Sequence, residues 1–370
     1  MTVSPKLGVV IVTYNASEVI RPCLESLLTA PGAGGLAIVV VDNASQDGTA
    51  DLIERWARGE AEQAPDPASP VPLRAAPKPL PLAIRAPGEV ADGSLTLIRW
   101  GLNRGFAYGV NRGLEALKSR DDVAAFWVLN PDCVVPPETP GRLRDFAFSE
   151  RFGLAGGRCR FYQRPDIVQT DGGKVSRSTG VCRGIHAGCP AAETPLPADD
   201  ELDFISGAHL LASRDYLAAV GLMPEDYFLY YEEVDWAFRR GTFALRVVPG
   251  ADIFHRGGAS IRSGTFARAP SSFANYFNHR NRMWFVRRHL TGRSSRALVW
   301  SFAKTLQVLA RDGWPEAWAL MKGVLGLAPP RRVRRSVADA AARAHAFPPS
   351  PHGPLRIIYK FCIKIFGSIS

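Results

Sequence analysis

The sequence places small polar clusters directly after three apolar runs. They are Thr13-Tyr14-Asn15, Asp42-Asn43 and Asn130-Pro131-Asp132. In an open α/β sheet, ligands collect at the carboxyl ends of the strands. Each cluster alone is also typical of a simple turn, because Asn and Asp commonly end strands. Together they predict one site, with hydrogen-bond acceptors for a ribose or a base and a carboxylate for a metal.

A glycine-rich segment, NRGFAYGVNRG at 103–113, begins a predicted helix. Glycine allows the backbone to approach a ligand closely, and the N-terminus of a helix favours anions. The spacings of the dinucleotide-binding fingerprint and of the P-loop are both absent. The segment therefore predicts a loop that approaches an anionic ligand in some other way.

Three carboxylates, Glu232, Glu233 and Asp235, lie at the start of a predicted short helix within DYFLYYEEVDWAFRRG. Acidic residues in a first turn are also explained by helix capping alone. However, repulsion between carboxylates and apolar neighbours raise a carboxyl pKa, which suits a general base. His255 follows a strand-like segment and is either structural or a second ligand, beside Asp132, for a divalent cation.

The segments that position these residues alternate between two types. Predicted strands cover 7–13, 36–41, 95–99 and 124–129. Predicted helices cover 18–28, with Ser17 as its N-cap, 49–57, which follows Asp47-Gly48, and 108–117. Alternation of this kind predicts a doubly wound parallel sheet. The range 60–93 interrupts the pattern with eight prolines. Its composition predicts a flexible surface insertion, partly in polyproline II conformation.

The basic charge of the 370-residue chain is concentrated towards its C-terminal end. The net charge is +10, and residues 279–370 carry +14 against −4 for the remainder. This asymmetry predicts a catalytic body and a segment that seeks an anionic surface. We do not expect nucleic acid as the partner, because no zinc-finger, helix-turn-helix or RNA-binding signature is present.

The sequence shows neither a secretory signal nor an apolar run of the ~20 residues that span a bilayer. Its six cysteines are irregularly spaced, which predicts reduced thiols and a cytoplasmic protein. Cys182, His186 and Cys189 offer three ligands at a spacing unlike that of known zinc sites, so we do not predict zinc there.

Seven segments, in order, resemble glycosyltransferase family 2, the inverting enzymes of GT-A fold, and within it the rhamnosyltransferase-like branch. The segments are Val9–Ser17, Val39–Thr49, Asn103–Gly113, Val128–Asp132, Phe204–Asp215, Tyr227–Gly241 and Phe254–Ser260. The resemblance implies an α/β fold with a doubly wound, mostly parallel sheet, made of a Rossmann-like nucleotide-binding half and an acceptor half. We expect the catalytic domain at 1–278, with the insertion at 59–94, and a basic helical extension at 279–370.

The resemblance also implies a role for each matching residue. On the donor side, the nucleotide-binding residues are Thr13, Asn15, Asp42, Asn103, Gly105 and Asn111, with Asp42 bound to the base. Asp132 and His255 hold Mg²⁺ or Mn²⁺ at the diphosphate. Glu233 is the catalytic base, Glu232 and Asp235 complete the acidic cluster, and Ser206, Gly207 and Trp236 lie on the acceptor side.

Two residues depart from the family pattern. The metal motif reads Asn-Pro-Asp instead of carrying two acids, which lowers its expected affinity for a cation. Glu233 replaces the usual Asp, and Glu232 and Glu233 could exchange roles because neighbouring helical residues point in different directions.

The resemblance implies a single displacement with inversion at the anomeric carbon. The expected donor is dTDP-rhamnose, with UDP-linked hexoses or galactofuranose as rivals. The expected acceptor is a glycan or lipid-linked hydroxyl in cell-surface polysaccharide synthesis. The segment Leu355–Phe366 has a cationic stripe typical of an interfacial helix, which predicts peripheral residence on the cytosolic face of an anionic inner membrane. The alternative is a catalytically silent module that binds a sugar nucleotide or a glycan.

Overall fold

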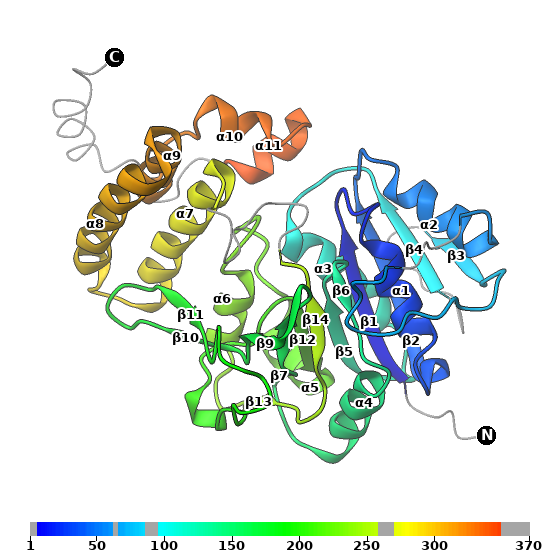
Figure 1. Ribbon diagram of the computed structural model, residues 1–370. Helices are drawn as coiled ribbons and strands as arrows, with labels where there is room; N and C mark the ends of the chain where they lie inside the picture. The colour runs from blue at the N-terminus through cyan, green and yellow to red at the C-terminus, as the bar shows by residue number, and fades with distance from the viewer. Residues whose placement is uncertain (1–5, 62–65, 86–94, 258–269, 349–370) are drawn as a thin grey trace. The chain divides into compact units, whose positions relative to one another are not determined.

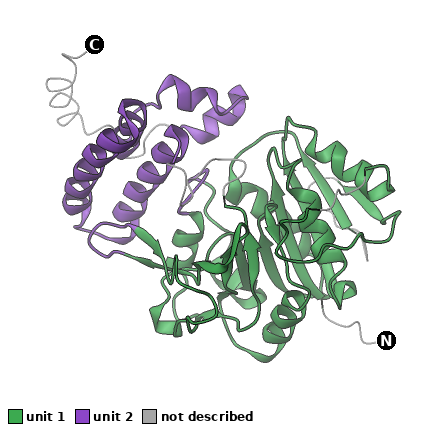
Figure 2. Cartoon of the chain, in the orientation of Figure 1, with its two compact units in different colours: residues 1–175, 182–225, 232–260 green, residues 176–181, 226–231, 261–370 purple. Residues whose placement is uncertain are grey.

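The computed structural model describes residues 6–61, 66–85, 95–257 and 270–348, and the chain forms two compact units (Figure 2). Unit 1 comprises residues 1–175, 182–225 and 232–260, and unit 2 comprises residues 176–181, 226–231 and 261–370. The division falls before the expected domain boundary at residue 278. In addition, two short segments of the predicted catalytic region belong to unit 2.

Unit 1 is built on a mixed sheet whose described strands follow the order β13-β7-β12-β5-β1-β2-β4-β3 (Figure 1). Pairing is parallel from β5 through β1, β2 and β4 to β3, whereas β12 runs antiparallel to β5 and β7. The strands are β1 (Lys6–Thr13), β2 (Leu36–Asn43), β3 (Leu82–Arg85), β4 (Leu95–Trp100), β5 (Val123–Leu129), β7 (Leu154–Gly156), β12 (His209–Ser213) and β13 (Leu245–Val247).

The predicted strands and helices of the N-terminal half are confirmed. The helices are α1 (Ile20–Leu28), α2 (Thr49–Arg58) and α3 (Phe106–Lys118). The prediction of Ser17 as the N-cap of α1 is wrong, because α1 begins two residues later than a Ser17 cap requires and its N-cap is Val19. The Ser17 backbone N–H instead donates to Asp47 Oδ2 at 3.0 Å, which joins the two loops after β1 and β2.

Strand β1 is buried on both faces because helices cover both sides of the sheet. Val9 and Ile11 belong to the core that also contains residues of α1 and α2. On the opposite face, a Cβ atom at Gly113 of α3 would lie only 2.4 Å from Val10 Cγ1. Glycine at this position therefore lets α3 pack closely against β1.

The prediction of a flexible insertion is wrong for its described residues. Leu82–Arg85 form β3, which pairs with β4 at the sheet edge. Buried Glu25 of α1 accepts a hydrogen bond from the Ala76 N–H at 2.6 Å and pairs with Lys78 at 3.2 Å. Without these bonds, the buried Glu25 carboxylate would lack hydrogen-bond partners, which costs folding free energy. The segment that contains Ala76 and Lys78 is therefore part of the packed domain. Residues 62–65 and 86–94 lie outside the described ranges.

A second sheet, with order β6-β14-β8-β9, carries the other site elements. Its strands are β6 (Cys133–Val134), β8 (Cys159–Phe161), β9 (Arg164–Thr170) and β14 (Ile253–His255), and a separate hairpin joins β10 (Gly173–Val175) to β11 (Cys182–Gly184). His255 pairs with Cys133 in the register of β14 and β6. The pairing places His255 beside the end of the motif that contains Asp132.

The remaining helices of unit 1 are α4 (Thr139–Ser149), α5 (Arg214–Val220) and α6 (Glu232–Phe238), with short 3₁₀ turns at Ala33–Gly35 and Asp199–Glu201. Unit 2 contains the expected C-terminal helices: α7 (Ser272–His289), α8 (Ser294–Asp312), α9 (Trp314–Val324), α10 (Arg331–Arg335) and α11 (Ala340–Ala346). Helices α7, α8 and α9 pack against one another. Among the described helices, none is long and apolar enough to cross a membrane.

Candidate active site

The ends of β1 and β2 are joined by Asp42. Thr13 Oγ1 donates to Asp42 Oδ1 at 2.9 Å, and the Ser45 N–H donates to Asp42 Oδ2 at 3.1 Å. Thr13 and Asp42 are both buried. Both carboxylate oxygens therefore already accept hydrogen bonds from the protein. Asp42 thus holds the loop after β2 in place, in addition to any contact that it makes with a ligand.

Asn15 holds the same two loops together from the other side. Its backbone has a φ of 51°, a left-handed conformation that Asn tolerates better than most residues. Its N–H donates to Ser45 Oγ at 2.9 Å, and its Oδ1 accepts from the Gln46 N–H at 2.8 Å. The structure thus brings the predicted donor-side residues Thr13, Asn15 and Asp42 into one network.

Asn43, which belongs to the predicted strand-end cluster Asp42-Asn43, connects the end of β2 to the loop that precedes α3. Its Nδ2 donates to Asn103 Oδ1 at 3.1 Å and to the Gly105 carbonyl at 2.9 Å. The Gly105 N–H in turn donates to Asn103 Oδ1 at 2.9 Å. Gly105 has a φ of 101°, which only glycine adopts readily. Asn43 therefore fixes the turn that leads into α3.

The Asn111 side chain is hydrogen-bonded within the protein. It is buried in α3, where its Nδ2 donates to the Met223 carbonyl at 2.8 Å and to Glu225 Oε1 at 2.9 Å. Its Oδ1 accepts from the Met223 N–H at 3.0 Å. The amide group of Asn111 thus anchors the 223–225 loop, and a contact between Asn111 and the nucleotide stays a prediction.

The predicted metal ligands do come together. His255 Nε2 lies 3.1 Å from Asp132 Oδ1 and 3.3 Å from Asn130 Nδ2, and Asp132 and His255 are both buried. On the other side of the ring, His255 Nδ1 lies 2.6 Å from Gln169 Oε1. An amide oxygen only accepts, so Nδ1 carries the proton in this arrangement, and Gln169 orients the ring as outer partners of metal ligands do. No motif around Gln169 in the sequence marks this role.

This carboxylate and imidazole fit a divalent cation. Among the described residues, Asp132, Cys133 and His255 form a cluster whose ligand atoms lie within 4.8 Å of one another. Burial raises the pKa of the Cys133 thiol well above its ordinary value, and the Asp132 charge raises it further. Because only the thiolate is a good ligand, Cys133 is not expected to bind the ion. Oxygen and nitrogen donors alone suit Mn²⁺ or Mg²⁺.

The Cys182, His186 and Cys189 group does not form a comparable cluster among the described residues. His186 Nδ1 instead lies 2.9 Å from Asp171 Oδ2.

Glu233 has the electrostatic environment of a general base. Burial raises the pKa of Glu233 to about 7, against the opposing effect of the Glu233 and Val234 N–H groups at the start of α6. A carboxylate with a pKa near neutrality is available as a base and can hold the proton it accepts. The cost of burying the charge therefore exceeds the stabilisation that the helix N-terminus provides.

The other two carboxylates of the cluster have different surroundings. Glu232 is buried at the first position of α6. Asp235 is also buried, and its carboxylate pairs with Arg239 at 3.2 Å, four residues further along the chain. This ion pair ties Asp235 to the end of α6, and its catalytic role stays a prediction.

On the predicted acceptor side, Gly207 is the residue that lies beside the base. A Cβ atom built on Gly207 would be 3.5 Å from Phe106 Cε1 and 3.7 Å from both Cβ and Cγ of Glu233. Ser206 precedes it, with its Oγ accepting from the Ala208 N–H at 3.3 Å. The Ala208 carbonyl accepts from the Asn130 N–H at 3.0 Å, so this loop connects the surroundings of Glu233 to the Asp132 motif.

Trp236, which was predicted on the acceptor side, makes its contacts within unit 1. Its side chain is fully buried, its Nε1 donates to the Gly221 carbonyl at 2.9 Å, and its ring packs edge-on against Tyr216. At the fifth position of α6 it faces away from the helix start, into the core of unit 1. Trp236 therefore stabilises α6 and has no exposed surface for an acceptor.

The aromatic segment 226–231, which leads into α6, belongs to unit 2. Phe228, Tyr230 and Tyr231 have φ angles of 65°, 71° and 77°, which are unfavourable for bulky residues. Asn281 of α7 offsets this cost, because its Nδ2 donates to the carbonyls of Tyr227, Leu229 and Tyr230 at 2.9, 2.6 and 3.0 Å. A helix fifty residues later in the chain thus determines the conformation before the predicted base.

Residues 8–65 match the family model described as Glycosyl transferase family 2. A curated relative, the low-salt glycan biosynthesis hexosyltransferase Agl10 of Haloferax volcanii, is 24% identical over 186 residues. That match covers 49% of this chain and 57% of the relative, so the chain spans little more than half of its length.

Solved structures also resemble the fold at low identity. The mannosyltransferase PcManGT of Pyrobaculum calidifontis, in complex with GDP-Man and Mn²⁺, has a TM-score of 0.49 and 16% identity, covering 93% of this chain and 86% of its own. TarS 1–349 of S. aureus has a TM-score of 0.46 and 14% identity, covering 92% and 88%.

The mixed sheet is an α/β architecture with polar residues at the carboxyl ends of its central parallel strands, where ligands collect in open sheets of this kind. The family match spans β1 to α2, where Thr13, Asn15 and Asp42 lie. Residues 8–65 of the chain are thus similar to the glycosyltransferases of family 2.

Proposed function

We propose that the protein is an inverting glycosyltransferase that moves a hexose from a nucleoside diphosphate sugar to a hydroxyl group of a glycan or lipid-linked acceptor. The observation that carries this proposal is Glu233, a carboxyl with a pKa of about 7 beside the small residue Gly207. The curated relative is named as a hexosyltransferase, which supports a hexose as the transferred group.

In the proposed reaction, Glu233 accepts the proton of the acceptor hydroxyl. The acceptor oxygen forms a bond to the anomeric carbon while the bond to the diphosphate oxygen breaks, so the nucleoside diphosphate leaves with the electron pair and the configuration inverts. Gly207 leaves room for the acceptor next to the Glu233 side chain. The network of Thr13, Asp42 and Asn43 holds the loops that bind the nucleotide.

Asp132 and His255 would hold the divalent cation, Mg²⁺ or Mn²⁺, with Gln169 and Asn130 fixing the imidazole. When bound, the cation supplies positive charge for the diphosphate that leaves. The identity of the sugar, rhamnose or another hexose on a dTDP or UDP carrier, is part of this proposal. Purified protein assayed against a panel of nucleotide sugars, with release of nucleoside diphosphate as the readout, identifies the donor.

We further propose that the basic C-terminal extension holds the protein at the cytosolic face of an anionic membrane. In α10, Arg331, Arg334 and Arg335 are exposed, and each basic group near an anionic surface contributes roughly 1 kcal/mol. The predicted interfacial segment Leu355–Phe366 lies outside the described residues.

The experiment that tests the proposed function is the substitution Asp132→Ala. We expect it to abolish metal-dependent transfer and to weaken Mn²⁺ binding, measured by electron paramagnetic resonance, while the melting temperature stays close to that of the wild type. Cys133→Ser is the matched control at the adjacent position, and it should keep Mn²⁺ binding because the buried thiol is not a ligand. Full activity of the Asp132→Ala protein in the presence of a chelator would refute both the metal site and the assignment.

A further inference from the structure

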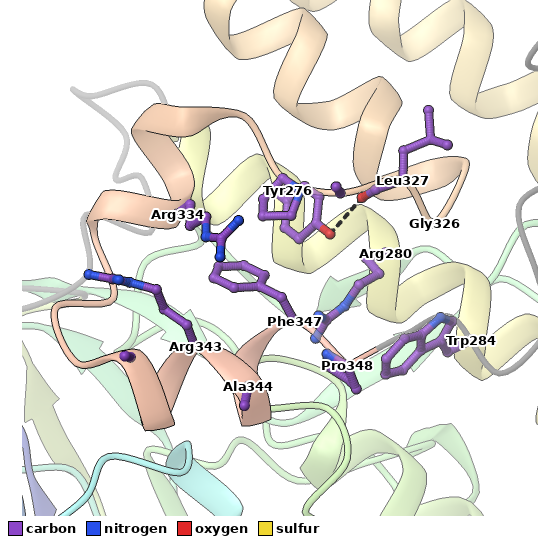
Figure 3. A pocket seen from close by; sticks show the side chains of 13 residues that line it. Tyr276, Arg280, Trp284, Gly326, Leu327, Arg334, Arg343, Ala344, Phe347 and Pro348 are labelled. Atoms are coloured by element: carbon purple, nitrogen blue, oxygen red, sulfur yellow. Dashed lines mark hydrogen bonds between the residues drawn. The ribbon is translucent and has the colours of Figure 1, made fainter.

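Unit 2 contains a cavity of about 400 Å³ within its own helices. Its lining combines three arginines, Arg280, Arg334 and Arg343, with the aromatic side chains Tyr276, Trp284 and Phe347 (Figure 3). No Asp or Glu is among the described residues that line it. The cavity is thus positively charged and has apolar walls.

Arg280 forms the buried part of the cationic lining. Its guanidinium donates to the carbonyls of Ala346 and Tyr227 at 2.5 and 2.8 Å and to Asn281 Oδ1 at 2.9 Å. These acceptors are all neutral, and burial lowers the pKa of Arg280 only to about 10, so the group is charged at neutral pH. The negative charge of Asp226 raises the pKa of Arg280, but the Asp226 carboxylate is paired with Arg288 at 2.5 Å.

The other two arginines are more accessible. Figure 3 shows Arg334 extending towards Phe347, whereas Arg343 lies at the rim. The Arg343 guanidinium donates to the carbonyls of Val337 and Ala338 at 2.8 and 2.6 Å, which are again neutral acceptors. Three cations therefore surround one hollow, and none of them is hydrogen-bonded to a carboxylate among the residues that the structure describes. A buried or half-buried charge of this kind is stabilised by an anion.

The surface of unit 2 adds a second, independent observation. Val299 and Leu306, seven residues apart on α8, are 71% and 62% exposed, and Trp314 at the start of α9 is 49% exposed. Residues 303 and 310, both alanine, are exposed on the same helical face of α8. An exposed apolar stripe with an aromatic residue next to it is typical of a helix that lies against lipid.

We propose that the cavity of unit 2 binds the terminal phosphate of a lipid, with the apolar part of the lipid against Trp284 and Phe347. A terminal phosphate carries ~1.5 to 2 negative charges near neutral pH, whereas a phosphodiester carries one. Three cations therefore complement a terminal phosphate better than a phosphodiester. The biological setting rests on the proposed membrane association, but binding to this cavity requires neither a sugar donor nor the catalytic carboxylate.

The test compares binding of the full-length protein to vesicles that contain phosphatidic acid and to vesicles of matched surface charge that contain phosphatidylserine. We expect a preference for phosphatidic acid of about tenfold, the contribution of one or two charge-assisted hydrogen bonds. Equal binding to both kinds of vesicle would overturn the proposal.

The chain offers a matched pair of variants, Arg334→Gln and Arg335→Gln. Both remove one charge from the exposed face of α10, but only Arg334 lines the cavity. The Arg334→Gln protein should lose the preference for phosphatidic acid, and the Arg335→Gln protein should keep it. An equal loss in both would show that net charge alone attracts the protein and would refute the cavity site.

A soluble competitor distinguishes the lipid from a free anion. Inorganic phosphate at the concentration of the accessible lipid phosphate should leave vesicle binding unchanged, because it makes no contact with the apolar walls. Complete displacement by inorganic phosphate would overturn the assignment to a lipid. Transfer activity is measured separately, so the absence of sugar transfer in a protein that prefers phosphatidic acid would refute only the proposed function.

Discussion

Two loop regions lead to the candidate site, and they are stabilised in different ways. The loops after β1 and β2 are held by their own polar residues, through short bonds among Thr13, Asn15, Asp42 and Ser45. The aromatic segment 226–231 is held by Asn281 and Arg280, which lie about fifty residues later in the chain. The loops of the first region are therefore held by residues of the two loops themselves, whereas the conformation of the second region depends on a helix later in the chain.

This difference indicates a division of labour. The donor-side loops lie at the ends of neighbouring parallel strands, where a rigid sheet supports them. The aromatic segment keeps three bulky residues in left-handed conformations and runs directly into Glu232, the first residue of α6. Changes on the donor side should therefore affect donor affinity, and changes in or near the aromatic segment should affect turnover.

The largest expected effect is that of Glu233→Gln at the end of the aromatic segment. We expect turnover to fall by ~10² to 10⁴-fold, the usual contribution of a general base, with little change in donor affinity. Single-turnover kinetics and donor titration measure the two quantities. Glu232→Gln is the matched control at the preceding position, and if it alone damages turnover, the choice of base within the pair is wrong.

The same variant separates a base from a helix cap. Since burial raises the pKa of Glu233 in the folded protein, the folded state binds the proton more tightly than the unfolded state. Stability therefore falls as the pH rises from the ordinary carboxyl pKa of 4.5 to about 7, and this loss is complete above the folded-state pKa. Glu233→Gln should raise the melting temperature above that pH. A lower melting temperature at alkaline pH would indicate that Glu233 only caps α6.

On the donor side, Asp42→Ala should raise the KM for the donor by about tenfold or more, because it leaves the Thr13 hydroxyl and the Ser45 N–H without their acceptor. Thr13→Val removes one of these bonds at similar volume and should have a smaller effect in the same direction. If Asp42→Ala lowers turnover and leaves the KM unchanged, the proposed division between the two regions is wrong.

The smallest effect is expected for Asn281→Ala. Three carbonyls of the aromatic segment lose their donor, which should cost ~1 to 3 kcal/mol of unfolding free energy and lower turnover without changing donor affinity. Urea denaturation and steady-state kinetics test both statements. Asn275→Ala on the same helix removes a bond to the Pro270 carbonyl and serves as the control. Equal turnover in the two variants would contradict a positioning role for Asn281.

The sequence predicted the donor half well because its signals are local. Alternating apolar runs predicted β1, β2 and α3, and the strand-end rule brought Thr13, Asp42 and Asp132 to one edge of the sheet. Residues whose roles depend on distant partners were not predicted. Asn111 and Trp236 match family motifs, but their side chains are hydrogen-bonded within the protein. Asn111 donates to Glu225 in the 223–225 loop, and Trp236 donates to the Gly221 carbonyl.

Other roles had no local signal at all. Gln169 contacts His255 only because β9, β8 and β14 are neighbours in the second sheet. The prolines at 60–93 suggested a flexible loop, but the buried Glu25 carboxylate, which lies far away in sequence, holds Ala76 and Lys78. Periodicity and composition describe a segment by itself. They do not show which buried charge elsewhere in the chain is neutralised or hydrogen-bonded by that segment.

The pH dependence of turnover tests the central claim, that Glu233 is the general base, most directly. With saturating donor and Mn²⁺, the turnover of the wild-type protein should rise about tenfold per pH unit below neutrality and level off above a midpoint near the pKa of Glu233, about 7. The residual turnover of Glu233→Gln should show no such rise. A wild-type profile without a transition near neutrality, or the same transition in Glu233→Gln, would contradict the account.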